Sequence, residues 1–273
     1  MQSPFAFFRG AAAVMRRTAG TVSIRVVLFA SLLVVAGALP AAAQVSPTAT
    51  PPAAPPSLAA VFGQVPKDLW HFLNWDTAKI LAIGGGAAAV GHIWDDDLSG
   101  ELETSVRLND AFSPGHTYGA FTVQVLIGAG LYTGGRIAKH GHLAQTGGDI
   151  MRAQLLSQGY VQVLKYSVGR ERPDGSDNRS FPSGHSASAF ATAGVLQHHY
   201  GWKVGVPATL VAGYVATARV HDNKHYLSDV IFGGAMGIAA ERTVTLHAGR
   251  YGFALAPSAE PGGARLTVAV RTR

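Results

Sequence analysis

The stretch Phe-Pro-Ser-Gly-His-Ser-Ala-Ser-Ala-Phe-Ala-Thr-Ala, residues 181–193, decides the fold. Pro182 and Ser183 stand before an alanine-rich run and mark the N-terminus of a helix. Such a terminus carries unpaired N–H groups and the positive end of the helix dipole, and Gly184 allows an anion to approach the backbone closely. The stretch therefore predicts a helix whose start can bind a phosphate. A plain helix cap with His185 at the surface is the alternative interpretation.

Apolar segments of helical length lie on both sides of this stretch. With the helix at 183–200 they cover roughly residues 70–94, 118–136, 149–168, 204–219 and 227–246. Helix-breaking sequences fall between them or near their ends, namely Ser113-Pro114-Gly115, Gly147-Gly148, Arg172-Pro173-Asp174-Gly175 and Val206-Pro207. The 33 glycines and many alanines favour closely packed helices. We expect an all-α bundle of five or six helices with an active site at helix ends, followed by a small hairpin-like tail around Glu260-Pro-Gly-Gly.

The composition limits the classes of function that are possible. At 48% hydrophobic and 14% charged residues, the 273-residue chain can bury one sizeable core. The net charge of +6 arises largely from Arg9, Arg16, Arg17 and Arg25, in a stretch without acidic residues, so the rest is nearly balanced and we expect no nucleic-acid partner. The absence of cysteine excludes disulfides, thiolate metal sites and a cysteine nucleophile.

The N-terminus has the plan of a secretory signal, with a basic region, an apolar run over Val26–Leu39 and Ala41-Ala42-Ala43. We expect a signal peptide over 1–43 cleaved after Ala43, with a retained membrane anchor as the alternative. A Pro/Ala-rich linker is expected over 44–66, a helical domain over 67–247 and the tail over 248–273.

The location follows from the same segments. Uncharged intervals between Asp110 and Arg136, and between Arg179 and Lys203, are long enough to cross a bilayer. The interval between Asp229 and Glu241 is too short, and much of the hydropathy comes from Gly and Ala, which drive insertion weakly. We expect an exported, periplasmic protein, with an integral inner-membrane protein as the second choice.

Two further clusters carry residues of chemical interest. Lys165 and Arg172 stand seven positions apart, about two helical turns, before Pro173. Cations at a helix C-terminus also offset the helix dipole, which is the alternative explanation. His225 and Asp229 lie four apart after Arg219, so the carboxylate can hold one imidazole nitrogen and leave the other free to attack. A solvated helix cap is the alternative there. An independent coincidence of three such clusters is improbable.

These three blocks resemble the type 2 phosphatidic acid phosphatase and vanadium haloperoxidase superfamily. Its signature is a Lys with Arg-Pro seven positions on, then Pro-Ser-Gly-His, then an Arg with His six and Asp ten positions on. Lys165, Arg172-Pro173, the block 182–185, Arg219, His225 and Asp229 satisfy it without a gap, and the resemblance covers about 149–240. One departure is Ala218, because the family usually has Ser before the third-block Arg.

The resemblance implies a role for each matching residue. Lys165, Arg172 and Arg219 would neutralise the phosphoryl oxygens, assisted by the backbone amides of Ser183 and Gly184. His225 would attack phosphorus to form a phosphohistidine and Asp229 would orient it. His185 would protonate the leaving oxygen and then activate water. No metal or other cofactor is expected, since three cations take its place.

The expected activity is a metal-independent phosphatase that cleaves phosphate monoesters or pyrophosphates. The substrate would be a phosphorylated lipid, such as phosphatidic acid or a prenyl pyrophosphate, or a small organic phosphate, with membrane contact and an oligomeric state left open. Loops over 98–115 and 140–148 would set head-group selectivity. The alternatives are a vanadium-dependent haloperoxidase, in which the pocket holds vanadate, and a catalytically silent bundle that binds anionic lipid.

Other polar residues receive weaker interpretations. Asp95-Asp96-Asp97 reads as a solvated helix end rather than a metal site, and Ser113-Pro114-Gly115-His116 as a loop. His116 and Tyr118 are candidates for lining the pocket. His198-His199 and Lys224 are expected at the surface, and His221 and Asp222 near the site without an assigned role.

Overall fold

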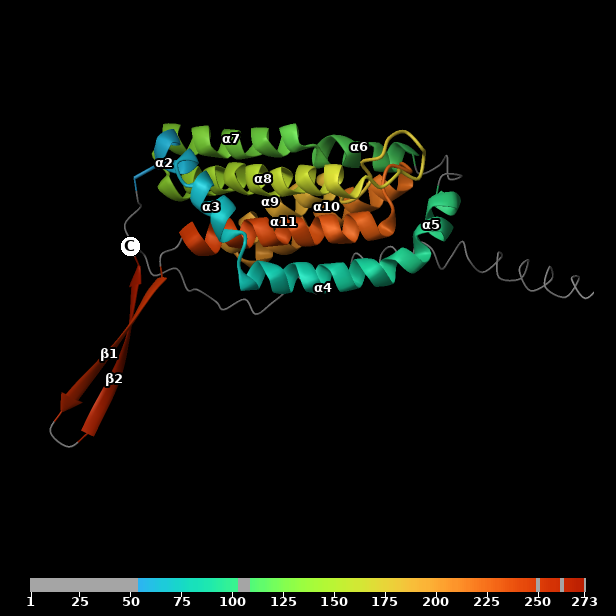
Figure 1. Ribbon diagram of the computed structural model, residues 1–273. Helices are drawn as coiled ribbons and strands as arrows, with labels where there is room; N and C mark the ends of the chain where they lie inside the picture. The colour runs from blue at the N-terminus through green and yellow to red at the C-terminus, as the bar shows by residue number, and fades with distance from the viewer. Residues whose placement is uncertain (1–53, 103–108, 249–250, 261–262, 273) are drawn as a thin grey trace, which may run out of the picture.

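The computed structural model describes residues 54–102, 109–248, 251–260 and 263–272. The predicted signal peptide and the first part of the linker lie outside them. Long helices form the body of the protein, with a two-stranded hairpin after the last of them, which confirms the all-α bundle (Figure 1). The six long helices in the described ranges are α4 (Trp75–Gly91), α7 (Phe121–Ile137), α8 (Gly141–Val168), α9 (Gly184–Tyr200), α10 (Trp202–His221) and α11 (Leu227–Ala248).

Shorter elements connect these helices. They are α2 (Leu58–Phe62), α3 (Val65–His71), the 3-10 helix η1 (His92–Trp94), α5 (Asp95–Leu102), α6 (Asn109–Gly119), β1 (Tyr251–Glu260) and β2 (Gly263–Thr272). The strands pair antiparallel from Tyr251 with Thr272 to Glu260 with Gly263, as the tail sequence predicts. The prediction that the linker runs to Pro66 is wrong, because Ser57 caps α2, Val61 is buried and α3 already begins at Val65.

The core is built from small side chains. Helices α8, α9 and α11 pack on one another, with α10 against α9, α4 against α11 and α7 against α8 (Figure 1). One buried cluster combines Leu156 and Met236 with the alanines Ala187, Ala191 and Ala239. Because alanine and glycine add little bulk, the helix backbones lie close together.

The glycine pair Gly147-Gly148 lies inside α8, which begins at Gly141, so its interpretation as a helix breaker and the expected loop over 140–148 are both wrong. A Cβ atom on Gly147 would lie 2.3 Å from the backbone nitrogen of Tyr132 in α7. The glycine therefore permits the close approach of two helices. That tertiary contact outweighs its weak helix propensity.

The segment around Pro114 is also helical, although the sequence suggests a loop. It lies within α6, where a Cβ on Gly115 would come within 2.6 Å of the Ala218 side chain of α10. The Tyr214 hydroxyl of α10 donates to the Ala111 carbonyl oxygen at 2.5 Å. Packing against α10 thus holds α6 together despite its proline, and it places Ala218, the departure from the family signature, against α6.

Gly237 gives a direct test of this close packing. A Cβ there would lie 2.3 Å from the carbonyl oxygen of Ala187 in α9, so Gly237→Ala must push α9 and α11 apart. We expect it to lower the free energy of unfolding by about 1–3 kcal/mol. Gly130→Ala in α7 is the control, because no atom lies within 4 Å of its added Cβ, and it should be neutral or stabilising. Chemical denaturation of both variants measures the difference, and equal effects would contradict the packing argument.

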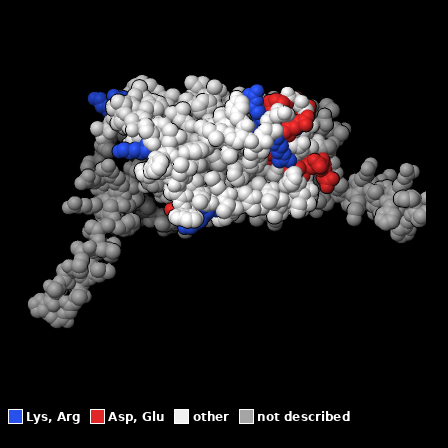
Figure 2. Space-filling view, viewed as in Figure 1, with Lys and Arg blue, Asp and Glu red and all other residues white. Residues whose placement is uncertain are grey.

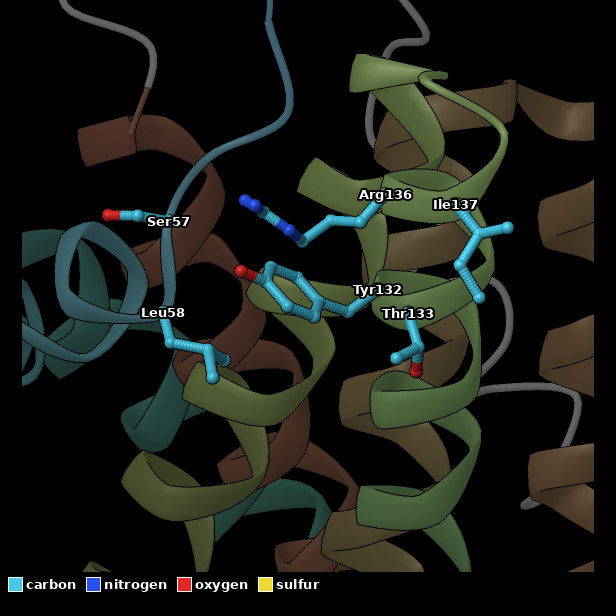
Figure 3. Close-up of a pocket in the computed structure, with 6 residues that line it drawn as sticks. All are labelled: Ser57, Leu58, Tyr132, Thr133, Arg136 and Ile137. Carbon is cyan, nitrogen blue, oxygen red and sulfur yellow. The ribbon is translucent and has the colours of Figure 1, made fainter.

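The segment before α2 is anchored on α7. Tyr132 and Arg136 point from α7 towards it across a shallow hollow that Ser57, Leu58, Thr133 and Ile137 also line (Figure 3). The Tyr132 hydroxyl donates to the Pro56 carbonyl oxygen at 2.8 Å, and Arg136 donates to the same oxygen at 2.8 Å. The hollow contains none of the predicted catalytic residues.

A buried ion-pair network fixes α3 to α8. Arg152 donates to both carboxylate oxygens of Asp68 at 2.7 Å and to Asp149 at 3.1 Å. The Nε2 atom of His199 lies 2.9 Å from the other Asp149 oxygen. The expected surface position is therefore wrong for His199, because its ring is held by a buried carboxylate, whereas His198 is exposed.

Charge and apolar side chains occupy different parts of the surface. Charged residues gather at the end near α5 and α6, and the middle of the face in Figure 2 is almost free of them. On α3 and α4, Trp70, Trp75 and Ile83 expose 76%, 81% and 74% of their surface. In the part of the chain that the structure describes, no helix is both long and apolar enough to span a membrane.

Candidate active site

The three sequence clusters meet at one end of the bundle. Lys165 lies in the last turn of α8, His185 in the first turn of α9, Arg219 in the last turn of α10 and Asp229 in the first turn of α11. His225 precedes α11. This is the end of the bundle where α5 and α6 lie (Figure 1). The antiparallel arrangement of α8 to α11 therefore places the site at helix ends, as predicted.

The three predicted phosphate-binding cations are all engaged within the protein. Lys165, 7% exposed, donates from Nζ to the carbonyl oxygen of Arg179 at 2.5 Å. Arg172 donates from Nε to Asp177 at 2.7 Å and from a terminal nitrogen to the Lys224 carbonyl oxygen at 3.0 Å. Arg219 donates to Asp222 at 2.9 Å, which gives Asp222 a contact that the sequence left unassigned. The carboxylates of Asp177 and Asp222 thus accept hydrogen bonds from Arg172 and Arg219 that phosphate oxygens could accept in their place.

The charges of Lys165, Arg172 and Arg219 favour the binding of an anion. Burial and the nearby charge of Arg172 lower the pKa of Lys165 to about 8. Burial also lowers the pKa of Arg219, and Arg172 adds to that shift. The Nε atom of Arg219 is buried and has no hydrogen-bond partner among the described residues. A bound dianion would relieve this repulsion and supply the missing acceptor.

Both predicted catalytic histidines are neutral at neutral pH. Burial lowers the pKa of His225 to about 4, although Asp229 opposes the shift. The His225 Nδ1 atom lies 3.8 Å from Asp229 Oδ2, longer than a hydrogen bond. Burial and the charge of Arg219 lower the pKa of His185 to about 3. A neutral His225 retains the lone pair that a nucleophile requires.

Asp229 is completely buried and held by three donors. Its Oδ1 accepts from Arg170 at 2.7 Å, and its Oδ2 accepts from the Ser180 hydroxyl at 2.5 Å and the Tyr226 amide at 2.9 Å. Burial alone would raise the pKa of Asp229, but the nearby His225, the hydrogen bond from Ser180 and the charge of Arg170 outweigh burial, so the pKa of Asp229 is lowered. The sequence analysis missed Arg170 and Ser180. The position of Arg170 inside the block from Lys165 to Arg172 is the signal that could have revealed it.

The structure does not support the predicted role of the Ser183 amide. That amide donates to the Asp229 carbonyl oxygen at 3.0 Å, so it is not available to phosphate. Ser183 is fully buried, and its side chain caps α9 by accepting from the Ser186 amide. Its part at the site is to join the start of α9 to the start of α11. Gly184 lies at the first position of α9, where the prediction placed it.

The remaining candidates near the site lie in different surroundings. His116 is exposed on α6, and its ring centroid lies 5.3 Å from that of His185. Tyr118 instead packs against the apolar core. His221 is buried beside Phe112 at 4.8 Å, and Lys224 is at the surface in an ion pair with Asp174.

The triple aspartate differs from expectation at its first member. Asp96 and Asp97 are exposed, but Asp95 is only 1% exposed and pairs with Arg170 at 2.8 Å. It is buried because Arg170 and the start of α11 supply its donors. Among the described residues, no group of three or more His, Asp or Glu side chains is placed to hold a metal ion.

Comparisons with known proteins agree on the class. Residues 149–250 match the model of the PAP2 superfamily. The chain is 43% identical over 86 residues to a lipid A 1-phosphatase of Porphyromonas gingivalis, covering 30% of this chain and 19% of that protein. It is 30% identical over 97 residues to a lipid A 4'-phosphatase of Helicobacter pylori, covering 32% and 49%.

A solved structure extends the likeness to the fold. The crystal structure of a transmembrane PAP2-type phosphatidylglycerolphosphate phosphatase from Bacillus subtilis superposes with a TM-score of 0.50 at 25% identity, covering 63% of this chain and 94% of that one. Residues 149–250 are therefore similar to the PAP2 superfamily in sequence, and the fold of the chain is similar to that of a PAP2-type phosphatase. The chain spans less than half the length of the curated relatives it matches.

Proposed function

We propose that this chain is a phosphatase that removes a phosphate group from a phosphorylated lipid, without a metal and through a phosphohistidine at His225. The observation that carries the proposal is the convergence of Lys165, Arg172 and Arg219 on two neutral histidines, the buried His225 and the half-buried His185. Three cations held together in a poorly solvated place are costly unless an anion joins them. The three belong to the motif of the superfamily, and they are the groups that phosphoryl transfer requires.

The first half of the reaction follows from the contacts of the free site. The phosphate displaces Asp177 from Arg172 and Asp222 from Arg219, and its oxygens take over those donors. His225 then attacks phosphorus, a bond forms from its Nε2 atom, and the bond to the leaving oxygen breaks. The imidazole gains positive charge as it does so. The carboxylate of Asp229, on the Nδ1 side of the ring, stabilises that charge.

His185 supplies the proton for the leaving oxygen. In the empty site its pKa is lowered to about 3 by burial and by Arg219, so it is neutral there. The negative charge of a bound phosphate favours the protonated form, which makes proton donation dependent on substrate. After the leaving group departs, the neutral His185 accepts a proton from water, and the hydroxyl attacks the phosphohistidine to release phosphate and restore His225.

A lipid substrate is supported by two observations. The curated relatives are lipid A phosphatases, and the similar crystal structure is that of a phosphatidylglycerolphosphate phosphatase. The exposed Trp70, Trp75 and Ile83 supply an apolar surface suited to contact with a membrane. We propose an envelope location for the same reason, with the phosphate entering the site while the acyl chains stay in the lipid.

Inhibition by vanadate in the presence of a chelator tests the proposal. Phosphate release from phosphatidic acid, phosphatidylglycerophosphate, a prenyl pyrophosphate and lipid A should persist in excess EDTA, because cationic side chains neutralise the phosphoryl oxygens. Vanadate should inhibit at concentrations well below KM, since a mimic of the pentacoordinate transition state binds more tightly than substrate. Malachite green detection of phosphate measures both effects.

Three outcomes would count against the proposal. They are no release from any of the four lipids, a strict need for added divalent metal, or insensitivity to vanadate. Oxidation of bromide by the vanadate-loaded protein with peroxide would support the haloperoxidase alternative instead.

The pH profile should be bell-shaped. Below about pH 4 His225 gains a proton and loses its lone pair, and above about pH 8 Lys165 loses its positive charge. We therefore expect kcat/KM to fall outside these limits. A bound phosphate raises the pKa of Lys165, so the alkaline limb of kcat should lie at higher pH than that of kcat/KM. Initial rates from pH 3 to 10 measure both limbs, and coincident alkaline limbs would contradict the assignment to Lys165.

A further inference from the structure

A buried polar cluster lies behind the Asp229 carboxylate, on the side away from His225. Arg170 is at its centre, in the connection between α8 and α9. One terminal nitrogen of Arg170 donates to Asp229 Oδ1 at 2.7 Å and to the Ser228 hydroxyl at 2.7 Å, and the other donates to Asp95 Oδ2 at 2.8 Å. The Tyr226 ring lies 4.0 Å from the guanidinium carbon. The proposed reaction uses none of these groups except Asp229.

Asp95 completes the cluster from the far side. Its Oδ1 accepts from the Ser228 backbone amide at 2.9 Å, and its Oδ2 accepts from the Ser228 hydroxyl at 2.6 Å. The Nδ1 atom of His92, on the exposed edge, lies 2.7 Å from the same Oδ2. Asp95 thus joins the start of α5 to the first turn of α11, where Asp229 lies.

The contacts fix the direction in which the Asp229 carboxylate points. Arg170 holds Oδ1, so Oδ2 remains towards His225, where the Ser180 hydroxyl and the Tyr226 amide hold it. Arg170 in turn cannot move towards Asp229, because Asp95 and Ser228 hold its other donors. A carboxylate whose two oxygens both accept hydrogen bonds rotates little. Free rotation of Asp229 would misalign the imidazole of His225.

The sharing of Arg170 also sets the local charge. Two buried carboxylates, Asp95 and Asp229, share one guanidinium, so Arg170 does not pair with Asp229 alone. The negative charge that Asp229 keeps balances the positive charge that His225 acquires when it attacks phosphorus. Without Asp95, Arg170 would pair with Asp229 alone and neutralise the carboxylate that His225 needs.

We propose that Asp95, acting through Arg170, is a positioning residue that orients and electrostatically poises the Asp229–His225 pair. The inference rests on the proposed phosphatase function. Asp95 belongs to the N-terminal half of the domain, outside residues 149–250 that match the superfamily model. The positioning contact therefore comes from a part of the chain that lies before the residues matched by the superfamily model.

The variant Asp95→Asn tests it, because the amide keeps the shape and removes the charge. We expect kcat to fall about 10- to 100-fold, while KM and the Kd of vanadate stay within about twofold, since the three phosphate-binding cations are untouched. Asp97→Asn is the matched control, two positions on, exposed and in the same helical turn. It should match the wild type in every measurement.

A double-mutant cycle separates positioning from a general structural role. If Asp95 acts through Asp229, adding Asp95→Asn to Asp229→Asn should cause little further loss of kcat with an activated aryl phosphate. Losses that multiply in the double variant would overturn the proposal, as would an unchanged kcat in Asp95→Asn. A parallel rise of KM and fall of kcat would also overturn it, because loosened packing disturbs binding as well as turnover.

A readout independent of turnover keeps the inference distinct from the proposed function. The imidazole ¹⁵N resonances of His225, identified by their loss in His225→Ala, should shift in Asp95→Asn in the same direction as in Asp229→Asn and stay in place in Asp97→Asn. Unshifted resonances overturn the positioning role, whereas absent phosphate release in the wild-type protein overturns only the proposed activity. Should Asp95→Asn fail to fold, Ser228→Ala removes one link between Asp95 and Arg170 and should lower kcat in the same way but less.

Discussion

Phosphate release by the His225→Ala variant should fall at least about 10⁴-fold, the largest effect expected of any single change in this protein. The reason is that no other group takes over the covalent step. His225 is 2% exposed, and its Nδ1 atom lies 3.8 Å from Asp229 Oδ2. Removal of its side chain leaves the cations in place, so vanadate should still bind.

Three measurements check this expectation. Steady-state release from a phosphorylated lipid gives the loss of turnover, and equilibrium binding of vanadate shows whether the pocket persists. Mass spectrometry of acid-sensitive, alkali-stable phosphoenzyme should detect a label on wild-type His225 and none in the variant. Asp229→Asn is the companion variant, which should fold normally and lower kcat about 10²- to 10⁴-fold through misorientation of the imidazole. Near-wild-type release by His225→Ala would remove the nucleophile assignment.

The second large effect concerns the leaving group and His185. His185→Ala should lose about 10²- to 10⁴-fold on ordinary phosphate esters, the usual contribution of a positioned acid. Much of the first step should return with dinitrophenyl phosphate, whose leaving group departs without a proton. The second step still lacks its base. Phosphohistidine should therefore accumulate in the variant and not in the wild type.

The comparison of substrates distinguishes this role from simple binding. Lys165 and Arg219 are expected to hold the phosphate equally for both esters, so a defect in binding would lower both rates by the same factor. His116→Ala is a useful control, because its ring lies 5.3 Å from His185 but is exposed on α6, and we assign it no proton transfer. Equal losses of His185→Ala on the two esters, with no trapped phosphoenzyme, would show that His185 binds phosphate or caps α9.

Hydrophobic periodicity and the positions of helix-breaking residues predicted most of the fold. The long helices α9, α10 and α11 lie close to the expected segments, because their small apolar residues form continuous helical runs. Apart from the linker, whose last part forms α2 and the start of α3, the errors fall at Gly147 and Pro114, where local sequence suggests a break. Both residues lie in helices because a neighbouring helix packs on them, which no local pattern shows.

The sequence alone determined which residue types stand in the three blocks and in what order, and so the kind of chemistry that Lys165, Arg219 and His225 can perform. Spacing also predicted that His225 and Asp229 lie close together, and they do, although His225 stands before α11 rather than on the same helical face as Asp229. Those conclusions depend only on local geometry and on the chemistry of side chains. They could be drawn before any helix was packed.

Only the tertiary structure decided how these groups are held. In the folded protein the Ser183 amide joins α9 to α11, and Arg170 and Ser180 donate hydrogen bonds to Asp229. Asp95, from the N-terminal half of the domain, accepts a hydrogen bond from Arg170. Asp95 and Asp229 are separated by most of the domain in sequence, and hydrogen bonds across that separation exist only once the start of α5 meets the start of α11. Burial, which lowers the pKa of both histidines and of Lys165, likewise arises from packing, since a sequence specifies charges but not the solvent around them.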